Sequence, residues 1–133
     1  MLVVDTNILV RFAVNDDAQQ VAQARRAIGT QAMWVSVTVL LELEWVLRSR
    51  YGYERKDIHT FLAQLLETTN VSVEDEAQVA TALDWYAEGS DFADAVHLAR
   101  TQSRGVMVTY DASFCKPAQR AGAKIKVLRA AVK

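Results

Sequence analysis

Short apolar runs alternate with longer segments of mixed polarity along the whole chain. The short runs predict buried strands at 1–5, 33–37, 70–74, 106–111 and 124–128. The longer segments have apolar residues at helical spacing, often with an acidic start and a glycine end, and predict helices at 6–14, 16–29, 38–52, 54–69, 75–89 and 90–105. Residues 113–122 fit a loop or a short helix. This alternation indicates an α/β fold with a roughly five-stranded, mainly parallel sheet flanked by helices.

The 133-residue chain is expected to form a single domain over residues 1–133, because it contains no linker-like, repeated or low-complexity stretch. Its net charge of −1 argues against a bulk polyanion binder. No apolar run approaches the ~20 residues of a membrane span, and the N-terminus lacks the basic start of a signal peptide. A single cysteine, Cys115, cannot form an internal disulfide. We therefore expect a reducing compartment, the cytoplasm, and no membrane partner.

Two of the predicted strands end in an aspartate, Asp5 and Asp111. In an open α/β sheet the ligand site lies outside the carboxyl ends of the strands, so both side chains are expected at one sheet edge. Each also fits a structural role, Asp5 as the cap of the next helix and Asp111 as the cap of the turn that follows it.

Asp91 and Asp94 begin a segment that otherwise reads as a buried helix. Residues three apart lie on one helix face, where two like charges repel each other. Capping of the helix by Asp91, with Asp94 reaching back to it, is the structural alternative.

The predicted helix 38–52 carries two acids, Glu42 and Glu44. Glu44 has Arg48 four residues later, which is the spacing of a surface ion pair. Glu42 has only uncharged residues at that spacing and is expected on an apolar face. An acid there needs backbone donors or a metal ion, and both alternatives stay open.

Several carboxylates in one cleft repel each other unless a cation offsets their charge. Mg²⁺ and Mn²⁺ prefer oxygen ligands, whereas zinc is disfavoured because no Cys/His cluster has ligand spacing. Nucleophilic triads and phosphate-binding glycine loops are absent, and neither histidine is linked to Cys115 by its position in the sequence. The acids therefore favour a hard divalent metal.

Four motifs in order resemble the PIN-domain family, and more narrowly the VapC toxins of bacterial type II toxin–antitoxin modules. "VVDTNILV" resembles the opening strand and carries Asp5. In "VSVTVLLELEWVL" a serine precedes the acid by six positions, here Ser36 and Glu42. "DFADAVHLA" resembles the third motif with Asp94, and "VTYDASF" the last motif with Asp111. The resemblance runs from the first predicted strand to the fifth.

The resemblance implies an Mg²⁺- or Mn²⁺-dependent endoribonuclease that hydrolyses a phosphodiester with a metal-activated water. Asp5 and Asp94 would be the principal metal ligands. Glu42 and Asp111 would complete the acidic pocket through water or orient the nucleophile, with Asp111 a further candidate ligand. Asp91 is close enough in the sequence to share the ion.

Supporting residues and partners follow from the same resemblance. Thr6, Asn7 and Thr109 would hold the metal ligands by hydrogen bonds. The protein would cut a structured RNA, form a homodimer and be neutralised by a small cognate antitoxin.

Three other functions remain as alternatives. A phosphoacceptor receiver domain would require an aspartate on a middle strand, which the sequence lacks. A catalytically inactive PIN-like binding module is disfavoured because all four pocket acids are present. A PIN ribonuclease outside any toxin–antitoxin system is not excluded by the sequence.

Two basic clusters fit either solvated helix faces or contacts with an RNA backbone. They are Arg48, Arg50, Arg55 and Lys56, and Lys116, Arg120, Lys124 and Lys126. The tryptophans, Trp34, Trp45 and Trp85, are interpreted as core or dimer-interface residues, and His97 as a helix residue that faces a neighbour.

Overall fold

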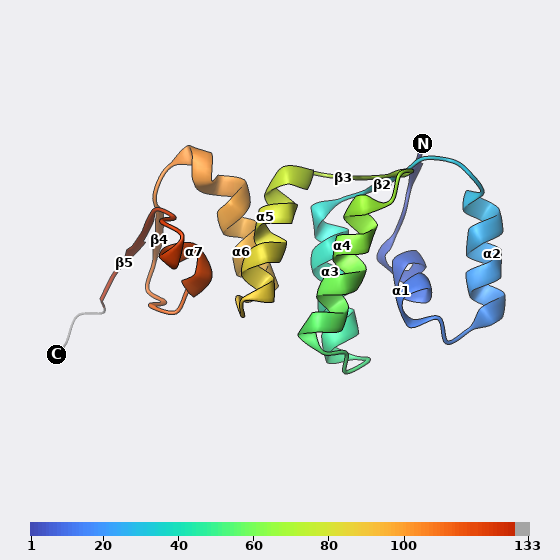
Figure 1. The fold of residues 1–133 in the computed structure, drawn as a ribbon, viewed down its shortest axis with the longest axis horizontal. Coiled ribbons are helices and arrows are strands. Elements are labelled where there is room, and N and C mark those ends of the chain that lie inside the picture. Colours follow the sequence, from blue (N-terminus) through green and yellow to red (C-terminus); the bar gives the residue numbers. More distant parts are fainter. Residues whose placement is uncertain (130–133) are drawn as a thin grey trace. The chain divides into compact units, whose positions relative to one another are not determined.

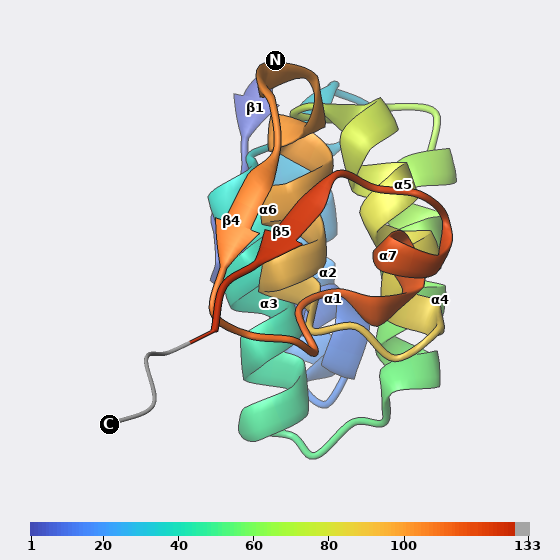
Figure 2. The same cartoon turned by 90° about the vertical axis from the view of Figure 1, so that its left-hand side faces the viewer.

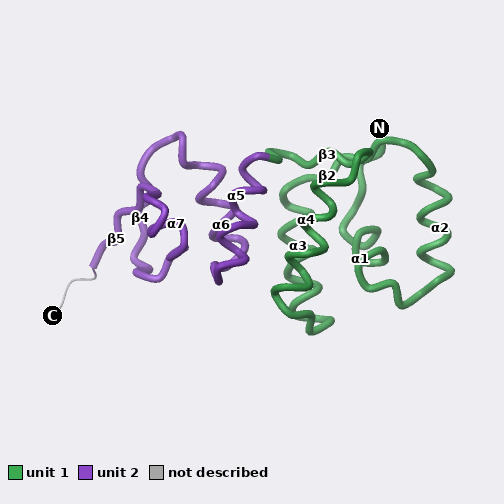
Figure 3. The backbone as a smooth tube through the Cα atoms, viewed as in Figure 1, with its two compact units in different colours: residues 1–76 green, residues 77–133 purple. Residues whose placement is uncertain are grey.

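The structure is a computed structural model that describes residues 1–129, so the last four residues of the predicted domain 1–133 lie outside it. Residues 1–76 and 77–133 form two compact units, shown in green and purple in Figure 3. Each unit has its own strands and helices.

The first unit is built around a parallel three-stranded sheet with the order β1-β2-β3. Its elements, labelled in Figure 1, are β1 (Leu2–Val3), α1 (Thr6–Val14), α2 (Ala18–Ile28), β2 (Met33–Val35), α3 (Val37–Ser49), α4 (Arg55–Glu67) and β3 (Val71–Val73). Val3 pairs with Trp34, and Val35 with Val73. This register brings the carboxyl ends of the three strands to one edge of the sheet.

The core of the first unit forms where α1 and α4 contact α3. The largest fully buried side chains there are Leu9, Val35, Val37, Leu43, Leu47, Ile58 and Leu62. Burial of such side chains is worth roughly 1.5–3 kcal/mol each relative to exposure, so this apolar interface holds the helices in place.

The second unit combines helices with a parallel two-stranded sheet, β4-β5. Its elements are α5 (Glu76–Ala87), α6 (Phe92–Thr101), a 3₁₀ turn (Gln102–Arg104), β4 (Met107–Thr109), α7 (Lys116–Arg120) and β5 (Ile125–Val127). β4 and β5 run side by side in Figure 2. The rings of Tyr86 and Phe92 meet edge to face at 5.2 Å, where α5 and α6 contact each other.

The α/β prediction is confirmed, since all five predicted strands are found and every strand pairing is parallel. The strands are shorter than the apolar runs that predict them, and they form a three-stranded and a two-stranded sheet. An apolar run predicts a strand, but it does not identify the strand with which it pairs. Within residues 1–129, no helix is long and apolar enough to cross a membrane.

Candidate active site

Asp5 lies at the carboxyl edge of the three-stranded sheet, between β1 and α1. Its Oδ1 accepts a hydrogen bond of 2.8 Å from the backbone N–H of Thr6, so it caps α1 as the structural alternative predicts. Thr6 is buried, while Asp5 and Asn7 are exposed. A carboxylate has two oxygens, so the cap leaves acceptor capacity for a metal ion or water.

The sequence predicts Glu42 on an apolar face and Glu44 at the surface, and the structure shows the reverse. Glu42 is exposed, and Glu44 is the acid on the apolar face, with 5% of its surface exposed. α3 buries Val37, Leu40 and Leu47, and residue 44 falls on the same helical stripe as these positions. Glu42 instead lies on the exposed face of α3.

The predicted ion pair between Glu44 and Arg48 is present, although its acid is not a surface residue. Arg48 Nε donates to Glu44 Oε2 at 2.8 Å, and the Glu44 side chain is only 6% exposed against 47% for Arg48. This pair gives Glu44 a structural role and leaves Glu42 as the accessible acid of the helix.

Two residues cap the first turn of α3 at the same sheet edge. Ser36 Oγ accepts from the backbone N–H of Val39 at 3.2 Å. Glu74, the residue after β3, accepts from the N–H of Val37 at 2.8 Å. Sequence reasoning did not single out Glu74, although it is the last residue of a predicted strand as Asp5 and Asp111 are. Its carboxylate ties the end of β3 to the helix that carries Glu42.

Asp91 and Asp94 have different surroundings at the start of α6. Asp91 Oδ2 accepts from the backbone N–H of Asp94 at 3.0 Å, which is the predicted cap. Asp94 is half-buried, and its burial raises the pKa of its carboxyl. The negative charges of Asp91 and Asp111 raise that pKa further, and His97 lowers it.

Asp111 is held in a tight turn after β4. Its Oδ1 accepts from the Ser113 hydroxyl at 2.6 Å and from the Ser113 N–H at 2.9 Å. These two bonds lower the pKa of Asp111, and Lys116 lowers it as well. The backbone N–H of Asp111 donates to Thr109 Oγ1 at 3.0 Å, so Thr109 fixes the backbone of this turn, and its support of a metal ligand stays a prediction. Ser113 is a supporting residue that sequence reasoning missed.

The structure thus brings together part of the predicted site. Within the second unit, the charges of Asp91 and Asp111 both act on Asp94, and these three acids are called the acidic cluster below. Asp5 and Glu42 belong to the first unit, where Asp5 caps the start of α1 and Glu42 lies in the middle of α3, and these two helices contact each other. Because β1 and β4 belong to different sheets, the meeting of Asp5 and Asp111 at one edge stays a prediction.

The donor chemistry of these acids fits a hard divalent metal. All are carboxylates, and their mutual repulsion at Asp94 is what a cation would offset. No group of three or more His, Cys, Asp or Glu side chains suited to a metal is present within residues 1–129. Mg²⁺ is commonly held by one or two carboxylates together with water and substrate phosphate, so a magnesium site does not require three protein ligands.

Other predicted features lie outside this chemistry. Cys115 is buried and accepts a hydrogen bond from Ser90 at 3.2 Å. Trp34 and Trp85 are half-buried. Trp45 is 49% exposed with the Arg50 guanidinium 5.7 Å from its ring centre, so it is not a core residue, and its place in a dimer interface stays a prediction.

The sequence matches the PIN domain family over residues 2–119. This match covers most of the chain, and the protein therefore belongs to the PIN domain family. No curated protein and no solved structure gave a significant match. PIN domains are generally metal-dependent nucleases that act on RNA, so membership supports nuclease activity with a divalent metal for this chain.

Proposed function

We propose that this protein is an Mg²⁺- or Mn²⁺-dependent endoribonuclease and the toxin of a type II toxin–antitoxin pair. The acidic cluster is the observation that carries the nuclease function, because Asp94 is held half-buried beside two other carboxylates. Such an arrangement is electrostatically unfavourable by itself and is relieved by a bound cation. The family match spans both compact units, which favours a single PIN domain.

Each acid has a separate role in this proposal. Asp5 and Asp94 would hold the metal, with Asp111 and Asp91 as further candidates. The metal would activate water and offset charge on the phosphate when bound. Glu42, on the open face of α3, would orient the attacking water. The two hydrogen bonds from Ser113 lower the pKa of Asp111, which favours the ionised form of its carboxylate as an acceptor.

The partners in this proposal come from the resemblance to VapC toxins. The substrate would be a structured RNA, the protein would act as a homodimer, and a small cognate antitoxin would neutralise it. Sequencing the 5′ ends of RNAs cut after brief induction in cells would identify the substrate. Full growth and intact RNA after induction would contradict the toxin role while leaving the nuclease testable in vitro.

The nuclease is tested with purified protein and a mixture of cellular RNAs in the presence of Mn²⁺. We expect cleavage by the wild type, no cleavage in EDTA, and no cleavage by Asp5→Ala or Asp94→Ala. Circular dichroism should show that both variants keep the fold. Activity that persists in EDTA would overturn the proposal, and wild-type protein that binds RNA without cutting it would favour an inactive binding module.

A further inference from the structure

We propose that the groove between α1 and α2 binds one nucleobase of the RNA substrate and so contributes to sequence preference. This inference rests on the proposed nuclease function and deepens it. The groove has a volume of about 380 Å³, within the range of small-ligand sites. It is lined by Asn7, Ile8, Arg11, Gln20, Gln23, Ala24 and Ala27, all from the first unit.

The shape of the groove follows from the residues at helical spacing on its two walls. On α2 the lining residues are spaced i, i+3, i+4 and i+7 from Gln20, which is one face of the helix. Two of these four positions are alanine, at 24 and 27, and their short side chains leave open space beside α1. Ile8 adds an apolar surface against which a flat ring would pack.

Three carboxamide side chains provide hydrogen-bond donors and acceptors in the groove. Asn7, Gln20 and Gln23 are exposed where they line the groove, so their side-chain amides are accessible to a ligand. Each carboxamide offers a donor and an acceptor in one plane. Unstacked RNA bases are recognised by such paired bonds on their edges. Adenine presents an acceptor beside an amino donor, the pattern that asparagine and glutamine match with two bonds.

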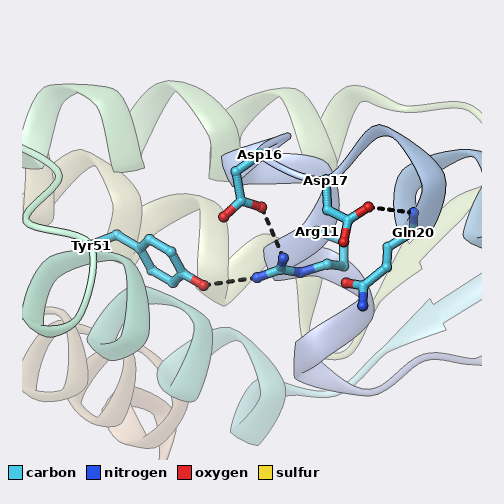
Figure 4. Close-up of polar contacts among 5 residues, drawn as sticks. All are labelled: Arg11, Asp16, Asp17, Gln20 and Tyr51. Atoms are coloured by element: carbon cyan, nitrogen blue, oxygen red, sulfur yellow. Dashed lines mark hydrogen bonds and ion pairs between the residues drawn. The ribbon is translucent and has the colours of Figure 1, made fainter.

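Arg11 forms a fixed wall of this groove rather than a phosphate site. Its guanidinium donates to Asp16 at 2.8 Å and to the hydroxyl of Tyr51 at 2.8 Å, as Figure 4 shows. Asp16 offsets its charge, which makes it a poor anchor for a phosphate. A guanidinium plane held in this way is a surface on which a base stacks.

The position of the groove links it to the proposed chemistry. Asn7 is two residues after Asp5 in the first turn of α1, so one end of the groove begins beside a proposed metal ligand. A base in the groove would belong to a nucleotide close to the cleaved phosphate. An unstructured peptide is the competing occupant, and the guanidinium plane of Arg11 beside the carboxamides favours a flat base over it.

The test measures base preference separately from cleavage. Fluorescein-labelled single-stranded RNAs of sequence UUUUXUUUU, with X as each of the four bases, are titrated with protein in EDTA and followed by anisotropy. We expect the wild type to bind X = A at least about fivefold more tightly than the weakest base. The double variant Gln20→Ala/Gln23→Ala should bind all four RNAs with the affinity of the weakest.

Gln19→Ala is the matched control, because Gln19 lies on the same helix and does not line this groove. Alanine favours helix at all three positions, so folding is preserved. Equal wild-type affinity for the four RNAs, or a preference that survives in the double variant, would overturn the proposal. Cleavage with Mn²⁺ is measured on the same proteins, so base preference without cleavage would overturn only the nuclease function.

Discussion

Asp91 and Asp94 are three residues apart, yet they have different roles at the residue scale. Asp91 is exposed, and its side chain is used to cap α6. Asp94 is half-buried, and two other acids raise its pKa. The doubled charge at the start of this helix is therefore one cap and one proposed metal ligand.

Substitution of Asp91 separates capping from metal binding. Asp91→Ser keeps a good cap and removes the carboxylate, so we expect wild-type stability and retained Mn²⁺-dependent cleavage. Asp91→Ala should lower the free energy of unfolding by about 1 kcal/mol through loss of the cap. Urea unfolding and RNA cleavage measure the two effects. Loss of cleavage in Asp91→Ser would instead make Asp91 a metal ligand.

Asp94→Asn is expected to abolish cleavage and to leave the metal-free protein at least as stable as the wild type. A raised pKa means that the folded state binds more protons than the unfolded state, so ionised Asp94 weakens the fold above that pKa. The stability gain of Asp94→Asn should therefore shrink as the pH falls through the raised pKa. Thermal unfolding in EDTA between pH 4 and pH 8 checks this, and a gain that grows towards acidic pH would contradict it.

At the scale of the element, α3 carries two acids in different surroundings. The helix buries Glu44 beside Leu40 and Leu47 on its core face and exposes Glu42. Arg48 neutralises the buried acid from within the same helix. Glu42 is therefore exposed on α3, and its charge does not have to be buried in the core.

Two substitutions in α3, Glu42→Gln and Glu44→Gln, test whether the exposed acid is catalytic and the buried acid is structural. Glu44→Gln should lower the free energy of unfolding by about 1–2 kcal/mol, because it weakens a charged hydrogen bond in a buried site. Glu42→Gln should change stability by less than about 0.5 kcal/mol and lower the cleavage rate strongly. Urea unfolding and single-turnover cleavage distinguish the two. The reverse pattern would place the catalytic acid at residue 44.

At the scale of the whole molecule, a chain with a net charge of −1 has to bind a polyanion through local positive surfaces. Arg48 is paired with Glu44, and Lys56 lies 3.6 Å from Glu54. Arg50 instead lies over the exposed ring of Trp45, a combination that suits contact with single-stranded RNA.

Arg50→Glu is therefore expected to raise KM for RNA cleavage more than it lowers kcat. The wild-type affinity for RNA should also fall steeply with salt, and the slope should become shallower in the variant. Arg104→Glu, an exposed charge reversal in the 3₁₀ turn, is the control and should change KM little. Equal kinetics for the wild type and Arg50→Glu would show that Arg50 does not belong to the RNA-binding surface.

Much of the fold was predictable because local signals mark both ends of most elements. Asp17 caps α2 through the N–H of Gln20, and Gly29 ends that helix with a positive φ of 57°. Helix capping and hydrophobic spacing act over a few residues, so the sequence displays them directly. The predicted cap at Asp91 and the turn at Asp111 belong to this local class and are confirmed.

By itself, the sequence determined the order of strands and helices, the candidate acids and the resemblance to PIN domains, since these depend on neighbouring residues or on motif order. Only the tertiary structure decided that Glu44 is buried while Glu42 is exposed, that Glu74 caps α3, and that the strands form two sheets. Those outcomes depend on which faces meet across long sequence separations. A helical pattern leaves that choice open when acids and apolar residues alternate as they do in "LLELEW".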